Sequence, residues 1–114
     1  MEDQVKKIVE ENKASGYSVV LIKIDLCEYI FRSISRGEWR KILSARYARL
    51  KGKEKDPLAM LESQEFESEE IAQSCTLYPI VNFDKLPAGV VLKLSDEILR
   101  LSSFEEEQLE VKRL

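Results

Sequence analysis

The feature that most constrains the fold is a change in hydrophobic period just after residue 34. Before that point, residues 18–34 hold two short runs rich in β-branched and aromatic residues, which alternate with the period of two typical of β-strands. After it, apolar residues recur three and four positions apart, which indicates an amphipathic helix. A lone β-hairpin is only marginally stable in water, so helices must cover it. We therefore expect a small single-domain α+β fold, with one β-hairpin packed by three to four α-helices.

The two runs predict the strands of the hairpin. We expect these strands over residues 18–24 and 29–34, joined by a four-residue turn over residues 25–28. Every second residue of a strand points to the same face of the sheet. The side chains expected to share faces in this way are Val20, Ile22 and Ile24 in the first strand, and Tyr29 and Phe31 in the second.

A capping box predicts where the next helix begins. Ser35 and Glu38 have the S-x-x-E spacing in which each side chain can accept a hydrogen bond from the backbone N–H of the other residue. The helix is expected to run to about Lys51 and to end at Gly52. Its expected inward stripe consists of Trp39, Ile42, Leu43, Tyr47 and Leu50.

The middle of the chain predicts two shorter helical segments. Residues 57–61 could form one helical turn, with proline at its first position, whereas the polar residues 63–67 are expected to be weakly ordered. Ser68 would then cap a helix that is stopped by Pro79. The expected inward edge of this helix consists of Ile71, Cys75 and Tyr78.

The last third predicts an apolar loop and a final helix. The loop spans residues 79–89, and we expect Phe83 and Leu86 to lie against the core. A helix over residues 90–103 would follow. Its expected inward residues are Val91, Leu94, Ile98 and Leu101, and Phe104 would cover its end.

These elements divide the chain into three parts. Residues 1–17 would form an N-terminal appendage, a thin amphipathic helix over residues 1–14 that stops at a Ser-Gly pair. Residues 18–104 would form the α+β domain, and residues 105–114 a charged C-terminal tail.

The charges are segregated along the chain. Nine basic and two acidic residues lie between positions 32 and 55, whereas positions 56–70 hold six acidic residues and no base. Such segregation suits either a charged partner surface or the neutralisation of one segment by the other within the chain.

The composition excludes several classes of enzyme. The sequence contains no histidine, so Ser-His-Asp and Cys-His nucleophile systems cannot form, and two cysteines are too few for a Cys/His zinc site. The four glycines are too far apart to build a phosphate-binding loop. Neighbouring carboxylates on the expected helices point about 100° apart and do not converge. We therefore expect no enzymatic activity, no catalytic residues, no cofactor and no metal site.

The N-terminus and the thiols indicate the compartment. Residues 1–4 are acidic and no apolar core follows them, so no signal peptide is expected, and the longest apolar run, residues 19–22, is too short to cross a membrane. Cys27 and Cys75 are expected to be reduced thiols that pack as small buried apolar groups. The sequence therefore predicts a cytoplasmic protein that does not contact a membrane.

The bases of the helix after residue 35 could form a binding surface. Together with Trp39 and Tyr47 they could bind nucleic acid. In the alternative interpretation the aromatics belong to the core and the bases form a solvated face. The acidic segment directly after the helix argues against a free basic surface, so a partner protein or an intramolecular role is favoured over nucleic acid.

Two blocks of the sequence resemble a known protein family. The first is K-I-D-L-C-E-Y-I-F-R-S-I-S-R-G-E-W-R-K-I over residues 23–42. The second and more specific block is E-E-I-A-Q-S-C-T-L-Y-P over 69–79, F-D-K-L-P-A-G over 83–89 and I-L-R-L-S-S-F over 98–104. This order resembles the small tail assembly chaperones of tailed bacteriophages, including the baseplate hub assembly proteins of T-even-like contractile tails. The resemblance covers about residues 18–104.

The resemblance implies a protein-binding function without catalysis. Such a protein would bind a tail component, for example a baseplate hub or tape-measure protein, and shield its apolar surfaces in the host cell cytoplasm until assembly. Two alternatives stay open: a permanent small structural protein of the phage baseplate, present in the virion, and a nucleic-acid-binding regulator. The residues expected to contact the partner are Tyr78, Pro79, Phe83 and Leu86 in the loop region, and Arg36, Arg40, Arg46 and Arg49 on the basic helix.

Overall fold

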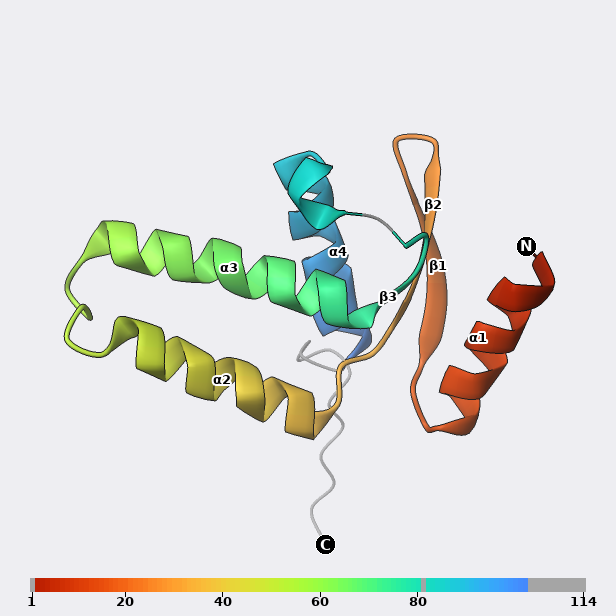
Figure 1. The fold of residues 1–114 in the computed structure, drawn as a ribbon, viewed down its shortest axis with the longest axis horizontal. Helices are drawn as coiled ribbons and strands as arrows, with labels where there is room; N and C mark the ends of the chain where they lie inside the picture. Colours follow the sequence, from red (N-terminus) through yellow and green to blue (C-terminus); the bar gives the residue numbers. More distant parts are fainter. Residues whose placement is uncertain (1, 81, 103–114) are drawn as a thin grey trace, which may run out of the picture.

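The protein has the expected α+β fold. The computed structural model describes residues 2–80 and 82–102. In this part of the chain, helices pack around one antiparallel sheet that contains the predicted hairpin (Figure 1). The elements are α1 (Glu2–Ala14), β1 (Val19–Ile24), β2 (Cys27–Arg32), α2 (Arg36–Leu50), α3 (Pro57–Cys75), β3 (Thr76–Tyr78), the short 3₁₀ turn η1 (Phe83–Lys85) and α4 (Ala88–Leu101).

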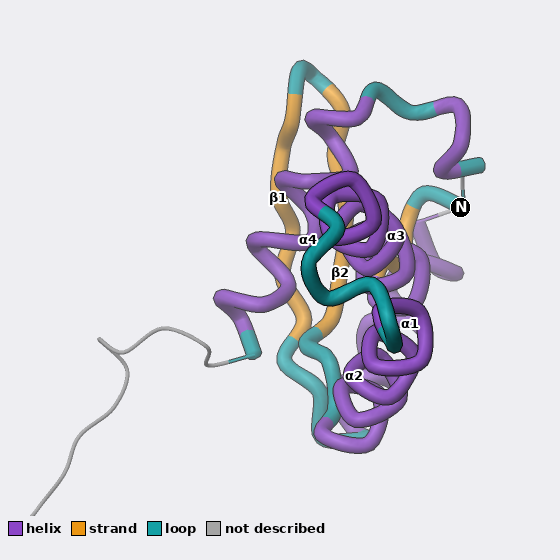
Figure 2. Tube along the Cα trace, turned by 90° about the vertical axis from the view of Figure 1, so that its left-hand side faces the viewer, coloured by secondary structure: helices purple, strands orange, loops and turns teal. Residues whose placement is uncertain are grey.

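The sheet has the strand order β1-β2-β3, so β2 is its central strand. Figures 1 and 2 show that α4 and the pair formed by α2 and α3 lie on one side of the sheet, whereas Figure 1 shows α1 on the other side. This arrangement buries both faces of β2. Tyr29, Ile30 and Phe31, which are consecutive residues, are all buried for this reason.

The turn of the hairpin is tighter than the four residues expected. Ile24 pairs directly with Cys27, which leaves only Asp25 and Leu26 in the turn, both with positive φ (48° and 70°). Positive φ at both central residues defines the type I′ turn, whose twist matches that of the flanking strands. Cys27 is therefore the first residue of β2, and it is exposed, so the prediction that both thiols are buried was wrong for Cys27.

The core lies between β2, the end of α3 and α4. Its largest fully buried side chains are Phe31, Cys75, Leu94 and Ile98. Burial raises the pKa of the Cys75 thiol to about 11, so this cysteine stays protonated at neutral pH. The prediction of a buried thiol is confirmed for Cys75.

The capping box at the start of α2 is confirmed. The Ser35 hydroxyl accepts a hydrogen bond from the Glu38 N–H (3.2 Å), and the Glu38 carboxylate accepts one from the Ser35 N–H (3.1 Å). Ile42 is buried as expected. Leu43 and Tyr47 are exposed, however, and Tyr47 keeps 73% of its surface in contact with solvent. Their assignment to the inward stripe was wrong, because α2 directs Arg46 and Arg49 towards α3 in their place.

Residues 57–75 form one continuous helix, which corrects the prediction of two short segments around a weakly ordered stretch. Asp56 caps α3 by accepting hydrogen bonds from the N–H groups of residues 58 and 59, and Pro57 occupies the first turn as expected. The polar stretch is helical because two of its side chains, Ser63 and Glu67, are buried against bases of α2.

The helix α3 ends at Cys75, three residues before the predicted end. Tyr78 therefore belongs to β3, where it pairs with Ile30 of β2, and not to the inward edge of a helix. The peptide bond between Tyr78 and Pro79 is cis. Pairing with β2 satisfies the backbone of this segment in place of another helical turn.

The final helix and the loop before it agree with the sequence pattern. Phe83 is buried and Leu86 packs against the core, as expected. The helix α4 begins at Ala88, two residues earlier than predicted, and directs Leu94 and Ile98 into the core. Phe104 and the predicted tail over 105–114 lie outside the described residues.

Candidate protein-interaction site

The helices α2 and α3 form an antiparallel pair that extends away from the sheet, which we call the arm (Figure 1). Only the base of the arm, where α2 begins and α3 ends, lies close to the strands. The rest of the arm exposes large apolar side chains. These are Leu43 and Tyr47 of α2 and Leu58, Met60, Leu61 and Phe66 of α3.

A partly buried ionic cluster holds the two helices of the arm together. Glu67 of α3 accepts hydrogen bonds from both Nε (2.8 Å) and a terminal nitrogen of Arg46, and these bonds raise the pKa of the Arg46 guanidinium. A guanidinium nitrogen of Arg49 lies 3.8 Å from the same carboxylate. Its Nε donates to the Ser63 hydroxyl at 3.3 Å, and its guanidinium stacks on the Phe66 ring at 4.7 Å. The basic and the acidic segments of the sequence therefore neutralise part of each other's charge within the chain.

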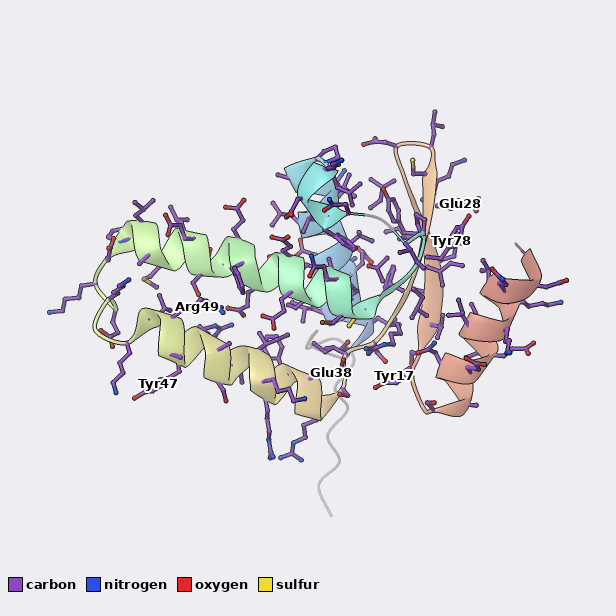
Figure 3. The ribbon with its side chains drawn as sticks, viewed as in Figure 1. Tyr17, Glu28, Glu38, Tyr47, Arg49 and Tyr78 are labelled. Carbon is purple, nitrogen blue, oxygen red and sulfur yellow. The ribbon has the colours of Figure 1, made fainter. Side chains whose placement is uncertain are left out.

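A second ionic cluster fixes the base of the arm to the sheet. Arg32 of β2 forms two parallel hydrogen bonds to the Glu38 carboxylate, both of 2.8 Å. It also donates to the carbonyl oxygen of Ser74 at 2.9 Å and covers the ring of Tyr17 at 4.3 Å. The bonds from Arg32 lower the pKa of Glu38 from its usual 4.5 to about 2. Figure 3 shows Glu38 and Tyr17 together at this end of the arm.

A groove runs between the arm and α4. It has a volume of about 550 Å³ and receives side chains from α2, α3 and α4. Its apolar lining residues are Trp39, Leu50, Met60, Leu61, Ile71, Leu92 and Leu99. Leu61 and Leu92 are the most exposed of them, with 63% and 50% of their surfaces in solvent. Glu65 and Asp96, both exposed, add negative charge to the lining, whereas the Glu67 carboxylate there is already paired with Arg46. A groove of this size and character is suited to an apolar partner side chain or helix.

The predicted contact residues do not come together in one place. Arg36 and Arg40 are exposed on the outside of α2, but Arg46 and Arg49 point into the arm, and Figure 3 shows Arg49 between its two helices. The predicted apolar contact residues lie on another part of the molecule, away from α2. Phe83 and Leu86 pack against the core, and Pro79 lies beside Phe83.

Tyr78 lies on the side of the sheet that faces α1. With Val5 and Val9 of α1 and Leu21 and Ile30 of the strands, it lines a second hollow of about 520 Å³. Figure 3 shows Tyr78 at the sheet and Tyr47 on the outer side of the arm. The two predicted contact regions therefore belong to different surfaces.

The sequence pattern did not indicate the exposed groove residues Leu61 and Leu92. Leu61 lies in a segment expected to form an isolated turn, and Leu92 falls outside the expected inward stripe of the final helix. One feature of the sequence did indicate an exposed apolar surface at the start of α3. Leu58, Met60 and Leu61 are apolar residues in the first turns of a helix whose buried positions further along are partly polar, so they had no core of their own to join.

Comparison with models of protein families, with curated proteins and with solved structures found no match. Within residues 2–80 and 82–102, no group of three or more histidine, cysteine, aspartate or glutamate side chains is placed to hold a metal ion. No helix in this part of the chain is both long and apolar enough to cross a membrane.

Proposed function

We propose that this protein is a non-enzymatic assembly chaperone of a phage tail or baseplate hub, which binds a tail component and shields it before assembly. The groove between the arm and α4 carries the proposal. It exposes leucine side chains from two helices beside a wall that includes Trp39 and Leu50. Contiguous exposed apolar surface of this kind marks sites of protein association.

The positions of the family-like motifs suggest that these motifs stabilise the fold and that a different surface binds the partner. Cys75, which begins the C-T-L-Y-P segment, is fully buried, and Leu86 of the L-P-A-G segment packs against the core. These motifs therefore act as fold determinants, which position α4 relative to the sheet. Binding then belongs to the groove that α4 borders, and a tail component would place an apolar helix or loop into it.

The proposal is tested by co-expression with the hub protein or the tape-measure protein encoded by the same phage genome. We expect the tail protein to become soluble and to co-purify with this chain. The variants Leu61→Asp and Leu92→Asp should abolish both effects, because each places a charge in the apolar groove. Leu26→Asp is the matched control, since Leu26 is an exposed leucine at the distant hairpin turn. Failure of both tail proteins to co-purify would contradict the proposal.

A permanent role in the baseplate is the alternative that the same groove allows. Mass spectrometry of purified particles separates the two: a chaperone is absent from mature virions, whereas a structural protein is abundant in them.

One observation favours a nucleic-acid-binding role as a second candidate. Tyr47 is exposed on the same helix as Arg36 and Arg40. Binding through these residues predicts retention on a DNA column with strong salt dependence. Elution at low salt, unchanged by Tyr47→Ala, would exclude it.

A further inference from the structure

We propose that a second copy of this chain occupies the groove, and that two copies form a two-fold symmetric dimer in which each inserts its α2 into the groove of the other. This inference concerns self-association and does not depend on the proposed role in phage assembly. It rests on an exposed ridge and a neighbouring groove that are complementary in shape and charge.

The ridge lies on the outer side of α2. Trp39, Leu43 and Tyr47 are four residues apart, and side chains with this spacing form a continuous ridge along a helix. Leu43 and Tyr47 are exposed. Arg36 and Arg40 form the next row and are also exposed. Trp39 itself is partly buried against the core, so the exposed part of the ridge is apolar towards the tip of the arm and basic towards its base.

The groove has the opposite character to the ridge. Leu61 and Leu92 provide exposed apolar surface, and Glu65 and Asp96 provide negative charge. Arg46 of α2 also lines the groove, but its charge is paired with Glu67, and no arginine or lysine occurs in α3. The basic row of the ridge would therefore meet the acidic residues of the groove, and Leu43 and Tyr47 would meet leucines.

The position of the ridge beside the groove permits a closed dimer. Trp39 begins the ridge and also lines the groove, so the two features are adjacent on one surface. When two such surfaces face each other across a two-fold axis, each ridge meets the partner's groove, and the same contact forms twice. Such an interface closes on itself and does not propagate into a filament.

Dimerisation would also explain how the exposed apolar side chains of the groove are shielded from water. Each copy would cover the groove of the other in the absence of any other partner. A tail component that binds the groove would then compete with the second copy.

Charge reversal tests this dimer without any other protein. Reversing the ridge (Arg36→Glu with Arg40→Glu) places acids against an acidic groove. Reversing the groove (Glu65→Lys with Asp96→Lys) places bases against a basic ridge. Each variant alone should dissociate on the order of 100-fold more readily than the wild type in analytical ultracentrifugation. All four positions are exposed, so each variant should fold, and circular dichroism is the check on this.

An equimolar mixture of the two reversed variants is the decisive measurement. In a two-fold dimer both contacts of the mixed pair become attractive again, so the mixture should form heterodimers close to the wild-type affinity. The proposal is overturned if the wild type is monomeric over the whole concentration series, or if mixing restores no dimer. It is also overturned if Leu21→Lys on the open edge of β1 dissociates the dimer while the ridge variants do not, since the sheet edge would then be the interface.

Discussion

At the scale of single residues, Leu26 lies in a backbone conformation that residues with a Cβ atom seldom adopt. Its φ is 70°, and its side chain is 88% exposed, so it makes little packing contact in return. Replacing it by glycine, Leu26→Gly, should stabilise the protein by about 0.5–1 kcal/mol, because glycine adopts positive φ without steric cost. Urea denaturation measures the change. Leu26→Ala is the control and should give no gain, because alanine retains the Cβ.

The pairing of Glu38 with Arg32 predicts a dependence of stability on pH. The pKa of Glu38 is lowered in the folded state to about 2, so its carboxylate stabilises the fold above pH 4.5 and this contribution is lost as the pH falls towards 2. At pH 7, Glu38→Gln should lower the free energy of unfolding by about 1–2 kcal/mol, a figure reduced for the partial exposure of the side chain.

Urea denaturation of wild type and Glu38→Gln over a pH series checks this expectation. The difference in unfolding free energy should shrink steadily between pH 5 and pH 2, because the wild-type carboxyl then becomes neutral as well. A difference that stays constant over this range would show that Glu38 acts only through the geometry of the helix cap and not through its charge.

At the scale of elements, the stability of the arm depends on one acidic side chain that provides the counter-charge for two basic side chains. Glu67 is buried and neutralises Arg46, with Arg49 close by. Glu67→Gln should lower the free energy of unfolding by about 2–3 kcal/mol, because both guanidinium groups would lose their counter-charge in a partly buried place. Urea denaturation measures the loss, and Glu62→Gln, on the exposed side of the same helix, should change stability by less than about 0.5 kcal/mol.

A double substitution separates charge from packing in the arm. If the cost of Glu67→Gln comes from unpaired bases, then Arg46→Met combined with Glu67→Leu should recover the part of the lost stability that Arg46 accounts for, since an apolar pair often replaces an ion pair without loss. Arg49 keeps its hydrogen bond to Ser63 in this variant but lacks the nearby carboxylate. A double variant that is less stable than Glu67→Gln alone would show that the ionic contacts themselves hold the two helices together.

The elements that the sequence predicted correctly are those whose signals are local. The capping box at Ser35 fixes the start of α2 through residues three positions apart, and the alternation of the hairpin lies within the strands themselves. The middle of α3 has no such signal. Its polar residues are buried because Arg46 and Arg49 face them from another helix, a long-range pairing that local periodicity does not contain. Tyr78 likewise became a strand residue because Ile30 pairs with it.

At the scale of the whole molecule, the candidate site was harder to predict than the fold. The sequence pointed to the bases of α2, and two of these, Arg46 and Arg49, are directed into the arm. The groove arises where three helices meet, and Leu61 and Leu92 are 31 positions apart in the sequence. Their proximity follows only from the way α3 and α4 pack.

Local stability also differs between the two sides of the sheet, where α1 and α4 lie. The apolar residues of α1, Val5, Ile8 and Val9, are only half-buried, and a hollow separates part of this helix from the strands. By contrast, α4 contributes fully buried Leu94 and Ile98. Amide hydrogens of α1 should therefore exchange roughly 100-fold faster than those of α4 in hydrogen-exchange mass spectrometry. Equal protection of the two helices would show that α1 unfolds only with the rest of the domain.

The hydrogen bond between the Ile34 N–H and the Ser102 hydroxyl joins residues 68 positions apart. A ribosome must therefore release almost the whole domain before this bond can form. The hairpin β1–β2 and the arm consist of neighbouring segments and can form early during synthesis, because closing a short loop costs little entropy. Phe31, however, packs in the same core as Leu94 and Ile98 of the last helix. The nascent chain thus carries an aromatic strand that is only partly covered until its final helix emerges, and this interval is when its own aggregation would compete most with folding.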